Sequence, residues 1–87
     1  MSSRRDLAPG GHALFSTRPV GLATSLFIQA GEHDSEAIWH IELCCQPDRP
    51  IPLGPNEQLR IDISAGAGAL VSIRNTGWAS FTTWTDY

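Results

Sequence analysis

Hydrophobic and polar residues alternate along most of this chain, most regularly over its last thirty residues, 58–87. Between 58 and 74 the apolar positions are Leu59, Ile61 and Ile63, followed by Ala69, Val71 and Ile73. Successive side chains of a β-strand point to opposite faces of a sheet, so this period of two predicts two strands. Glycines between the two runs, and the sequence Asn75-Thr76-Gly77 after them, predict chain reversals before a β-favouring segment from Trp78 to Tyr87. The pattern predicts an antiparallel meander.

Three earlier segments are also strand candidates. His12 to Ser16 is short, and Leu22 to Ala30 is longer, with every second residue from Leu22 to Ile28 on one face. Glu36 to Cys45 fits a strand with every second residue from Ala37 to Leu43 turned inward. It also fits a helix capped at Asp34 or Ser35. The alternation favours the strand.

Two segments lack this alternation. Met1 to Gly11 is polar, ends in Pro9-Gly10-Gly11, and is predicted to be a flexible arm. Gln46 to Glu57 holds four prolines, and proline cannot donate to a sheet ladder. This segment is predicted to be an extended connector that crosses between sheets or covers a sheet edge. We expect an all-β fold: a small antiparallel β-sandwich or flattened barrel of about six short strands, with an arm at 1–11 and one domain at 12–87.

The small size and the two cysteines limit how the fold is stabilised. A chain of 87 residues buries only about 60–65% of the surface that its unfolded form exposes, so a thin core is expected. Cys44 and Cys45 are adjacent, and a disulfide between neighbours closes a strained ring. We expect two reduced thiols, one of them packed in the core, which suggests a reducing compartment.

Charge and hydropathy argue against several partner classes. The net charge is −3, which argues against nucleic-acid binding. All six basic residues are arginine, which suits partly buried interfaces better than lysine. Met1 to Gly11 lacks the apolar region of a secretion signal. No apolar stretch reaches the length of a membrane span. We therefore expect neither nucleic-acid nor membrane binding.

No residue pattern predicts catalysis, a cofactor or a bound metal. The loop from Glu32 to Glu36 gathers carboxylates around His33, but it lacks the spacing of a calcium loop and is typical of a solvated turn. His40 and Glu42 share a strand face without a nucleophile motif beside them. The segment Gly66-Ala67-Gly68 lacks the lysine and the helix of a phosphate loop. The chain is expected not to be an enzyme.

Aromatic and arginine residues are the candidate contact residues. If 78–87 is one strand, Trp78 and Trp84 share one face and Phe81 lies on the other. Inward tryptophans would give the thin core more buried area, which favours that arrangement. Inward Phe81 would leave an exposed tryptophan pair that could stack on sugars or pack against a subunit. Arg4 and Arg5 in the arm, and Arg74 on an outward face, are candidates for binding a partner.

The end of the chain resembles small accessory virion proteins of tailed bacteriophages. The likeness rests on Leu53-Gly54-Pro55-Asn56-Glu57-Gln58-Leu59 and on the V-x-I-x-N-T-G pattern from Val71 to Gly77. It covers about the C-terminal third. The resemblance implies a decoration, cement or tail-associated subunit, located in the virion or in the host cytoplasm during assembly. It supplies no motif residues.

We expect a non-enzymatic structural or interaction module that docks on other protein subunits, as a homo-oligomer or within a larger assembly. Arg4, Arg5, Arg74, Trp78 and Trp84 are its predicted partner-binding residues. Two alternatives remain at this stage. One is a small carbohydrate-binding module that binds glycans through exposed tryptophans. The other is an inhibitor of a host enzyme encoded by a mobile element.

Overall fold

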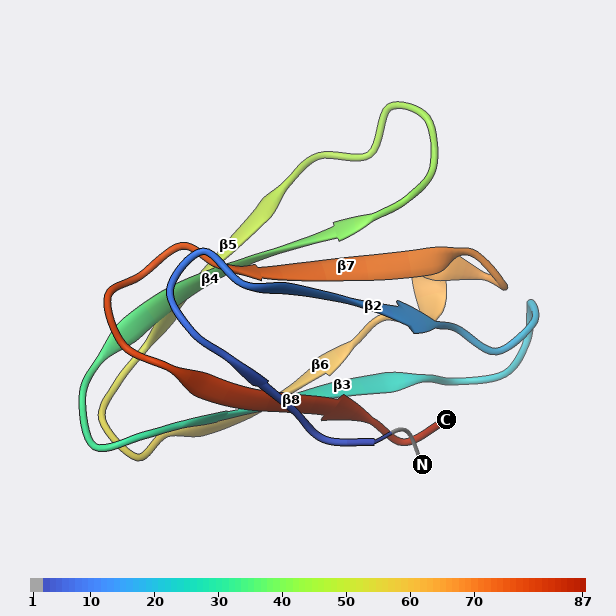
Figure 1. Cartoon of the computed structure of the whole chain (residues 1–87). Coiled ribbons are helices and arrows are strands. Elements are labelled where there is room, and N and C mark those ends of the chain that lie inside the picture. Colours follow the sequence, from blue (N-terminus) through green and yellow to red (C-terminus); the bar gives the residue numbers. More distant parts are fainter. Residues whose placement is uncertain (1–2) are drawn as a thin grey trace.

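The computed structural model describes residues 3–87 and folds them into two antiparallel sheets that face each other (Figure 1). The strands are β1 (Arg5–Leu7), β2 (His12–Ser16), β3 (Ser25–Ala30), β4 (Ser35–Ile41), β5 (Arg49–Leu53), β6 (Gln58–Asp62), β7 (Leu70–Asn75) and β8 (Phe81–Thr85), with a 3₁₀ turn η1 at Ser64–Gly66. The first sheet has the order β1-β8-β3-β6, and the second has the order β2-β7-β4-β5. The predicted all-β sandwich is confirmed, with eight strands in the described residues in place of about six.

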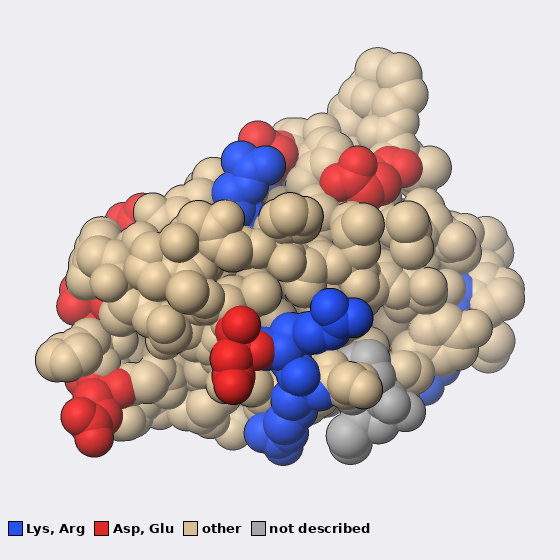
Figure 2. All heavy atoms as spheres, in the orientation of Figure 1, with Lys and Arg blue, Asp and Glu red and all other residues tan. Residues whose placement is uncertain are grey.

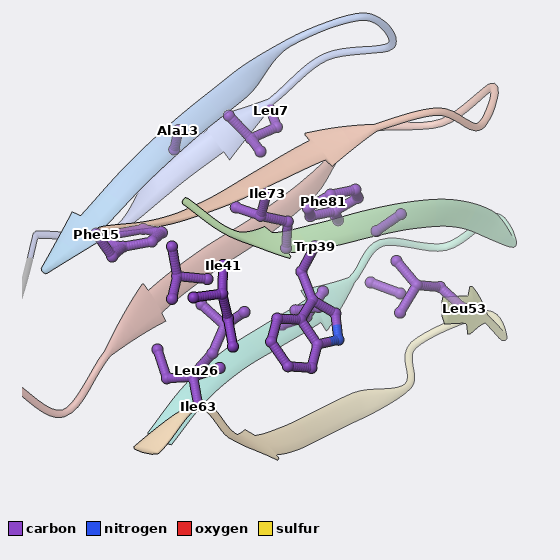
Figure 3. Close-up of a cluster of buried hydrophobic side chains, with 14 residues drawn as sticks. Leu7, Ala13, Phe15, Leu26, Trp39, Ile41, Leu53, Ile63, Ile73 and Phe81 are labelled. Atoms are coloured by element: carbon purple, nitrogen blue, oxygen red, sulfur yellow. The ribbon is translucent and has the colours of Figure 1, made fainter. Parts of the chain in front are cut away.

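Apolar side chains from both sheets fill the space between them. Figure 3 shows Trp39, Ile41 and Leu26 within one interior cluster. The buried apolar residues of this cluster are Leu7, Ala13, Phe15, Leu26, Ile28, Ala30, Ala37, Trp39, Ile41, Leu53, Ile63, Val71, Ile73 and Phe81. Most of them occupy every second position of a strand, as alternation requires when one face of a sheet is covered and the other faces solvent.

Two segments that were predicted to lack strands each contain one. Arg5–Leu7, inside the predicted flexible arm, pairs with β8, and Leu7 packs into the core. The prediction of a wholly flexible arm is therefore wrong for these residues, because three residues are enough for an edge strand when a buried leucine anchors them. Met1 and Ser2 of that arm lie outside the described residues. The proline segment forms β5, which pairs with β4 at the edge of the second sheet.

The segment from Glu36 to Cys45 is a strand and not a helix, but it ends at Ile41. Leu43 is exposed as a result, and the cysteines lie in the loop that projects between β4 and β5 (Figure 1). Cys44 and Cys45 are both exposed free thiols with their sulfur atoms 3.0 Å apart. The expectation that one of them packs in the core is wrong, since the strand that would have carried it inward stops earlier.

The turn after β7 joins the two sheets through a buried asparagine. Asn75 Nδ2 donates to the carbonyl oxygens of Leu7 and Ala79, each at 2.8 Å. Asn75 Oδ1 accepts from the Gly77 N–H at 3.0 Å and from the Ser35 hydroxyl at 3.3 Å. A side chain at position 77 would overlap the Glu36 amide nitrogen and the Ser35 hydroxyl. Asn75 and Gly77 are thus required by packing as well as by the turn.

Candidate protein-interaction surfaces

Trp84 lies on the outer face of the first sheet, where other side chains cover it. Phe81 faces the core, so the favoured arrangement with inward tryptophans is wrong. The ring of Trp84 stacks on Phe27 of β3 at a centroid distance of 5.5 Å and an interplanar angle of 10°. The guanidinium of Arg4 lies 4.0 Å from the Trp84 ring centroid. Trp84 is only 6% exposed as a result, although it points away from the core.

Trp78 does not lie beside Trp84 on this outer face. β8 begins at Phe81, so Trp78 lies in the loop before the strand, where it is 61% exposed. Its indole Nε1 donates to Asp34 Oδ1 at 3.3 Å. The two tryptophans therefore form no shared exposed platform, because the loop breaks the alternation that would have aligned them.

The predicted partner-binding residues are spread over separate surfaces. Arg4 and Trp84 meet on the outside of the first sheet. Arg74 lies on the outer face of the second sheet, opposite His12 on β2 and Ile38 on β4. On the face drawn in Figure 2, arginines and acidic residues form small separate groups. Of the five predicted partner-binding residues, the structure thus brings Arg4 and Trp84 together and does not gather the others around them.

Arg5 lines a groove at the end of the sandwich where β1 and β2 lie beside each other. Its lining residues are Ser3, Arg5, Leu14, Phe15, Ser16, Thr85 and Tyr87, and its volume is about 450 Å³. Leu14 and Tyr87 are about half exposed there, at 50% and 49%. The groove therefore offers apolar surface and one guanidinium. Sequence analysis named Arg5 but missed Leu14 and Tyr87, because an alternating pattern does not show which outward residues border a groove.

The free edge of β2 runs along this groove. The Thr17 N–H donates to the Ala69 carbonyl, and the Asn75 N–H donates to the Gly11 carbonyl. Residues 11 and 17 therefore direct their backbone groups toward β7. Since alternate residues of a strand direct these groups to opposite sides, His12, Leu14 and Ser16 direct theirs to the unpaired edge. Such an edge can accept another extended chain.

The edge of β5 is different, because prolines occupy it. The Glu36 carbonyl accepts from the Thr76 N–H, and the Glu42 N–H donates to the Leu70 carbonyl, so even-numbered residues of β4 face β7. The odd-numbered residues of β4 face β5, and their register partners are Arg49, Ile51 and Leu53. Pro50 and Pro52 thus stand where an N–H would point to the free edge. The proline segment was expected to be a connector that crosses between sheets or covers an edge, and it is instead the edge strand itself.

A serine, a histidine and an aspartate come together outside the second sheet without forming a catalytic arrangement. His40 lies opposite Ser72, and its Nδ1 is 3.2 Å from Asp48 Oδ1. The Ser72 hydroxyl donates to the His40 carbonyl oxygen at 3.4 Å and not to its ring. The hollow that they line, with Ile38 and Arg74, measures about 80 Å³, which is below the usual size of a ligand pocket.

Within residues 3–87, no group of three or more histidine, cysteine, aspartate or glutamate side chains is arranged to hold a metal ion. No helix in the same range is long and apolar enough to cross a membrane.

Comparisons with known proteins find similar folds but no family. No protein-family model matches the chain, and no curated protein matches its sequence. A de novo designed double-stranded β-helix has a TM-score of 0.54 at 18% identity, over 95% of this chain and 92% of the design. Drosophila melanogaster CENP-C, solved bound to CAL1, has a TM-score of 0.52 at 14% identity, over 94% of this chain and 59% of that one.

Peruvianin-I, a cysteine peptidase from Thevetia peruviana latex, has a TM-score of 0.50 at 22% identity, over 94% of this chain and 45% of that one. This chain thus spans about half the length of the two natural proteins, and none of the three is described as a phage protein. At these identities the comparisons show the fold alone, an eight-stranded sandwich similar to a double-stranded β-helix.

Proposed function

We propose that this chain is a non-enzymatic interaction module that docks on other protein subunits. One observation supports it above the others: the unpaired edge of β2 lies along a groove lined by Arg5, Leu14 and Tyr87. An extended segment of a partner would pair with this edge through its backbone. An apolar side chain of the segment would pack against Leu14 and Tyr87, and a carboxylate would bind Arg5.

In the described part of the chain, the space between the two sheets is filled by side chains and leaves no room for a ligand, which favours binding at the surface. The residues that face each other across the sandwich are apolar and almost fully buried, for example Leu26, Ile41 and Val71. The small hollow beside His40 has a serine whose hydroxyl already donates to a carbonyl oxygen. The proposal therefore assigns no chemical step to the chain.

The biological setting that we propose is an accessory subunit of a tailed-phage virion, on the strength of the resemblance at the C-terminal third. Among the similarly folded proteins, CENP-C was solved bound to another protein, CAL1, so a related fold takes part in a protein complex. The carbohydrate-binding alternative is weaker, because Phe27 and Arg4 occupy the ring of Trp84. Only the net charge of −3 supports the alternative that the chain inhibits a host enzyme.

Selection from a display library of random linear peptides on the immobilised chain tests the proposal. We expect enriched peptides with alternating apolar residues and at least one acidic residue. Leu14→Asp and Arg5→Glu should each weaken their binding about tenfold or more, the loss expected when a contact of about 1.4 kcal/mol is removed. Arg74→Glu is the matched control, since it makes the same charge change on another surface. Failure to enrich peptides, or equal binding by all three variants, would contradict the proposal.

A further inference from the structure

The edge strand of the first sheet, β6, has an unpaired side that no proline blocks. The Ala30 N–H donates to the Glu57 carbonyl at 2.8 Å, and the Ile63 N–H donates to the Thr24 carbonyl at 2.9 Å. Odd-numbered residues of this segment therefore face β3. The backbone N–H and C=O groups of Gln58, Arg60 and Asp62 face away from the sheet. β6 thus presents donors and acceptors where β5 presents two prolines.

On its free side, β6 has no neighbouring strand among residues 3–87. Leu59 and Ile61 are half-buried and pack against the core from one side only. Gln58, Arg60 and Asp62 are exposed on the opposite face. The strand therefore combines an apolar row that a further strand would extend with a polar row that carries one charge of each sign.

We propose that β6 pairs antiparallel with β6 of a second copy, with Arg60 of each chain opposite Asp62 of the other. This inference rests on the proposed function and names one of the protein partners. Exchange of the free backbone groups requires even-numbered residues to meet even-numbered ones. Three registers near the strand centre satisfy this rule: they place Arg60 opposite Arg60, Ile61 opposite Ile61, or Leu59 opposite Leu59.

Charge decides among these registers, since Leu59 opposite Leu59 leaves Arg60 opposite the uncharged Gln58. The first puts like charges directly opposite each other, which destabilises a strand pair. The second puts Arg60 and Asp62 together twice and Ile61 against Ile61, where the side chains of a pair without hydrogen bonds come close. The hydrogen bonds from Ser64, including its N–H at 2.9 Å, lower the pKa of Asp62, so its carboxylate is charged at neutral pH. Arg60 Nε donates to Ser25 Oγ of the neighbouring β3 at 3.0 Å, so this side chain must turn from β3 toward the free edge to meet Asp62 of the second copy.

The twofold symmetry of the contact, and not the other edges, closes this pairing, since β2 keeps a free edge. A twofold contact uses the same strand of both copies, so it ends at two chains. β5 precedes β6 in the chain and forms an edge of the second sheet. It cannot continue the pairing, because Pro50 and Pro52 lack the N–H groups that a further strand would need. β1, at the far edge of the first sheet, has only three residues. The arrangement gives a dimer and not a filament.

Size-exclusion chromatography with light scattering tests the pairing in reducing buffer. We expect the wild-type chain to have about twice its monomer mass of 9.4 kDa. Arg60→Asp and Asp62→Arg should each give monomers, and the double exchange R60D/D62R should restore the dimer. Restoration distinguishes the Ile61 register from the Arg60 register, because the exchange leaves like charges opposite each other when Arg60 faces Arg60.

Arg60→Pro supplies a second test, because it removes the edge-facing N–H of residue 60 as well as its guanidinium, and circular dichroism shows whether each variant is folded. A folded Arg60→Pro chain that stays dimeric would overturn the pairing. So would a wild-type monomer, or a dimer abolished by Leu14→Asp and unaffected by Arg60→Asp, which would place self-association at β2. Binding of groove-selected peptides by an Arg60→Asp monomer would show that the proposed function stands without this inference.

Discussion

The guanidinium of Arg18 holds the C-terminal end of the chain to the loop between β2 and β3. Arg18 Nη1 lies 3.1 Å from Asp86 Oδ1 and 2.6 Å from the Ala23 carbonyl oxygen, and Nη2 lies 2.7 Å from the Asp86 carbonyl oxygen. The Asp86 carboxylate also accepts from the Ser25 N–H at 2.9 Å. Residues that are 68 positions apart thus share one network at the end of the first sheet.

Replacement of Arg18 by alanine should destabilise the fold by about 1–2 kcal/mol, because charge-assisted hydrogen bonds are lost at a site that is only partly shielded from solvent. Arg18→Lys should recover only part of the loss, since an ammonium group cannot make the planar contacts to both the carboxylate Oδ1 and the backbone carbonyl oxygen of Asp86. Urea unfolding followed by tryptophan fluorescence measures the difference. Equal stabilities for wild type and Arg18→Ala would show that the network contributes nothing.

The same network predicts a pH dependence. The Ser25 N–H, followed by the Arg18 side chain, lowers the pKa of Asp86 below its ordinary value. A carboxylate whose pKa is lower in the folded state than in the unfolded state stabilises the fold at pH values above the unfolded-state pKa, which is about 3.9. That stabilisation is lost as the pH falls through the folded-state pKa. Asp86→Asn should therefore destabilise the chain by about 1 kcal/mol at neutral pH. The gap to wild type should shrink below about pH 4. A gap that is constant with pH would contradict this assignment.

Removal of the buried amide at position 75 should have a larger effect. Asn75→Ala removes the amide donor from the carbonyl oxygens of Leu7 and Ala79, of which Ala79 keeps only the Ser35 hydroxyl at 2.8 Å, and it creates a void at a buried site. We expect a loss of roughly 2–4 kcal/mol. Thr76→Ala is the control, because Thr76 is exposed in the same turn and should change stability by less than about 0.5 kcal/mol. A comparable loss of stability in Thr76→Ala would show that the turn conformation, and not the Asn75 amide, is responsible for the effect.

The tight contact at Gly77 gives a steric prediction. Gly77→Ala would place a methyl group on the Glu36 amide nitrogen and the Ser35 hydroxyl, so β4 must shift or the turn must open. A loss of roughly 1–3 kcal/mol is expected from such overpacking. At Gly31, where an added methyl group would lie 3.6 Å from the Ser80 carbonyl oxygen, alanine should be tolerated. Thermal unfolding of the two variants compares these sites directly, and equal melting temperatures would refute the contact.

The exposed cysteines predict rapid thiol chemistry without loss of fold. Both thiols should react with a disulfide reagent such as DTNB in the native chain, because neither is covered. The hydrogen bond with Cys44 raises the pKa of the Cys45 thiol. One of the two reactions should therefore be slower at neutral pH. A double serine variant should unfold at the same urea concentration as wild type. A single reactive thiol, or a clear loss of stability, would place a cysteine in the core after all.

Strand identity was predictable from the sequence because it depends on side-chain alternation along the chain. The inward positions of the segment from Ala69 to Arg74, and those of 37–41, are the buried ones in the structure. Prolines at every second position of β5 indicated an edge for the same reason, since their missing N–H groups cannot serve a central strand. β1 was missed because it has only three residues, of which Leu7 alone is apolar, and three residues are too few to show a period.

Which strands become neighbours, and what covers their outer faces, was decided only by the tertiary structure. Trp84 points outward as a period of two allows, yet it is buried because β3 brings Phe27 beneath its ring and β1 brings Arg4 over it. The groove at Arg5 likewise exists only because β1 and β2, in different sheets, lie side by side. Alternation assigns a residue to one side of its own strand. It contains no information about the residues from distant segments that complete that side, and those contacts create the candidate surfaces of this protein.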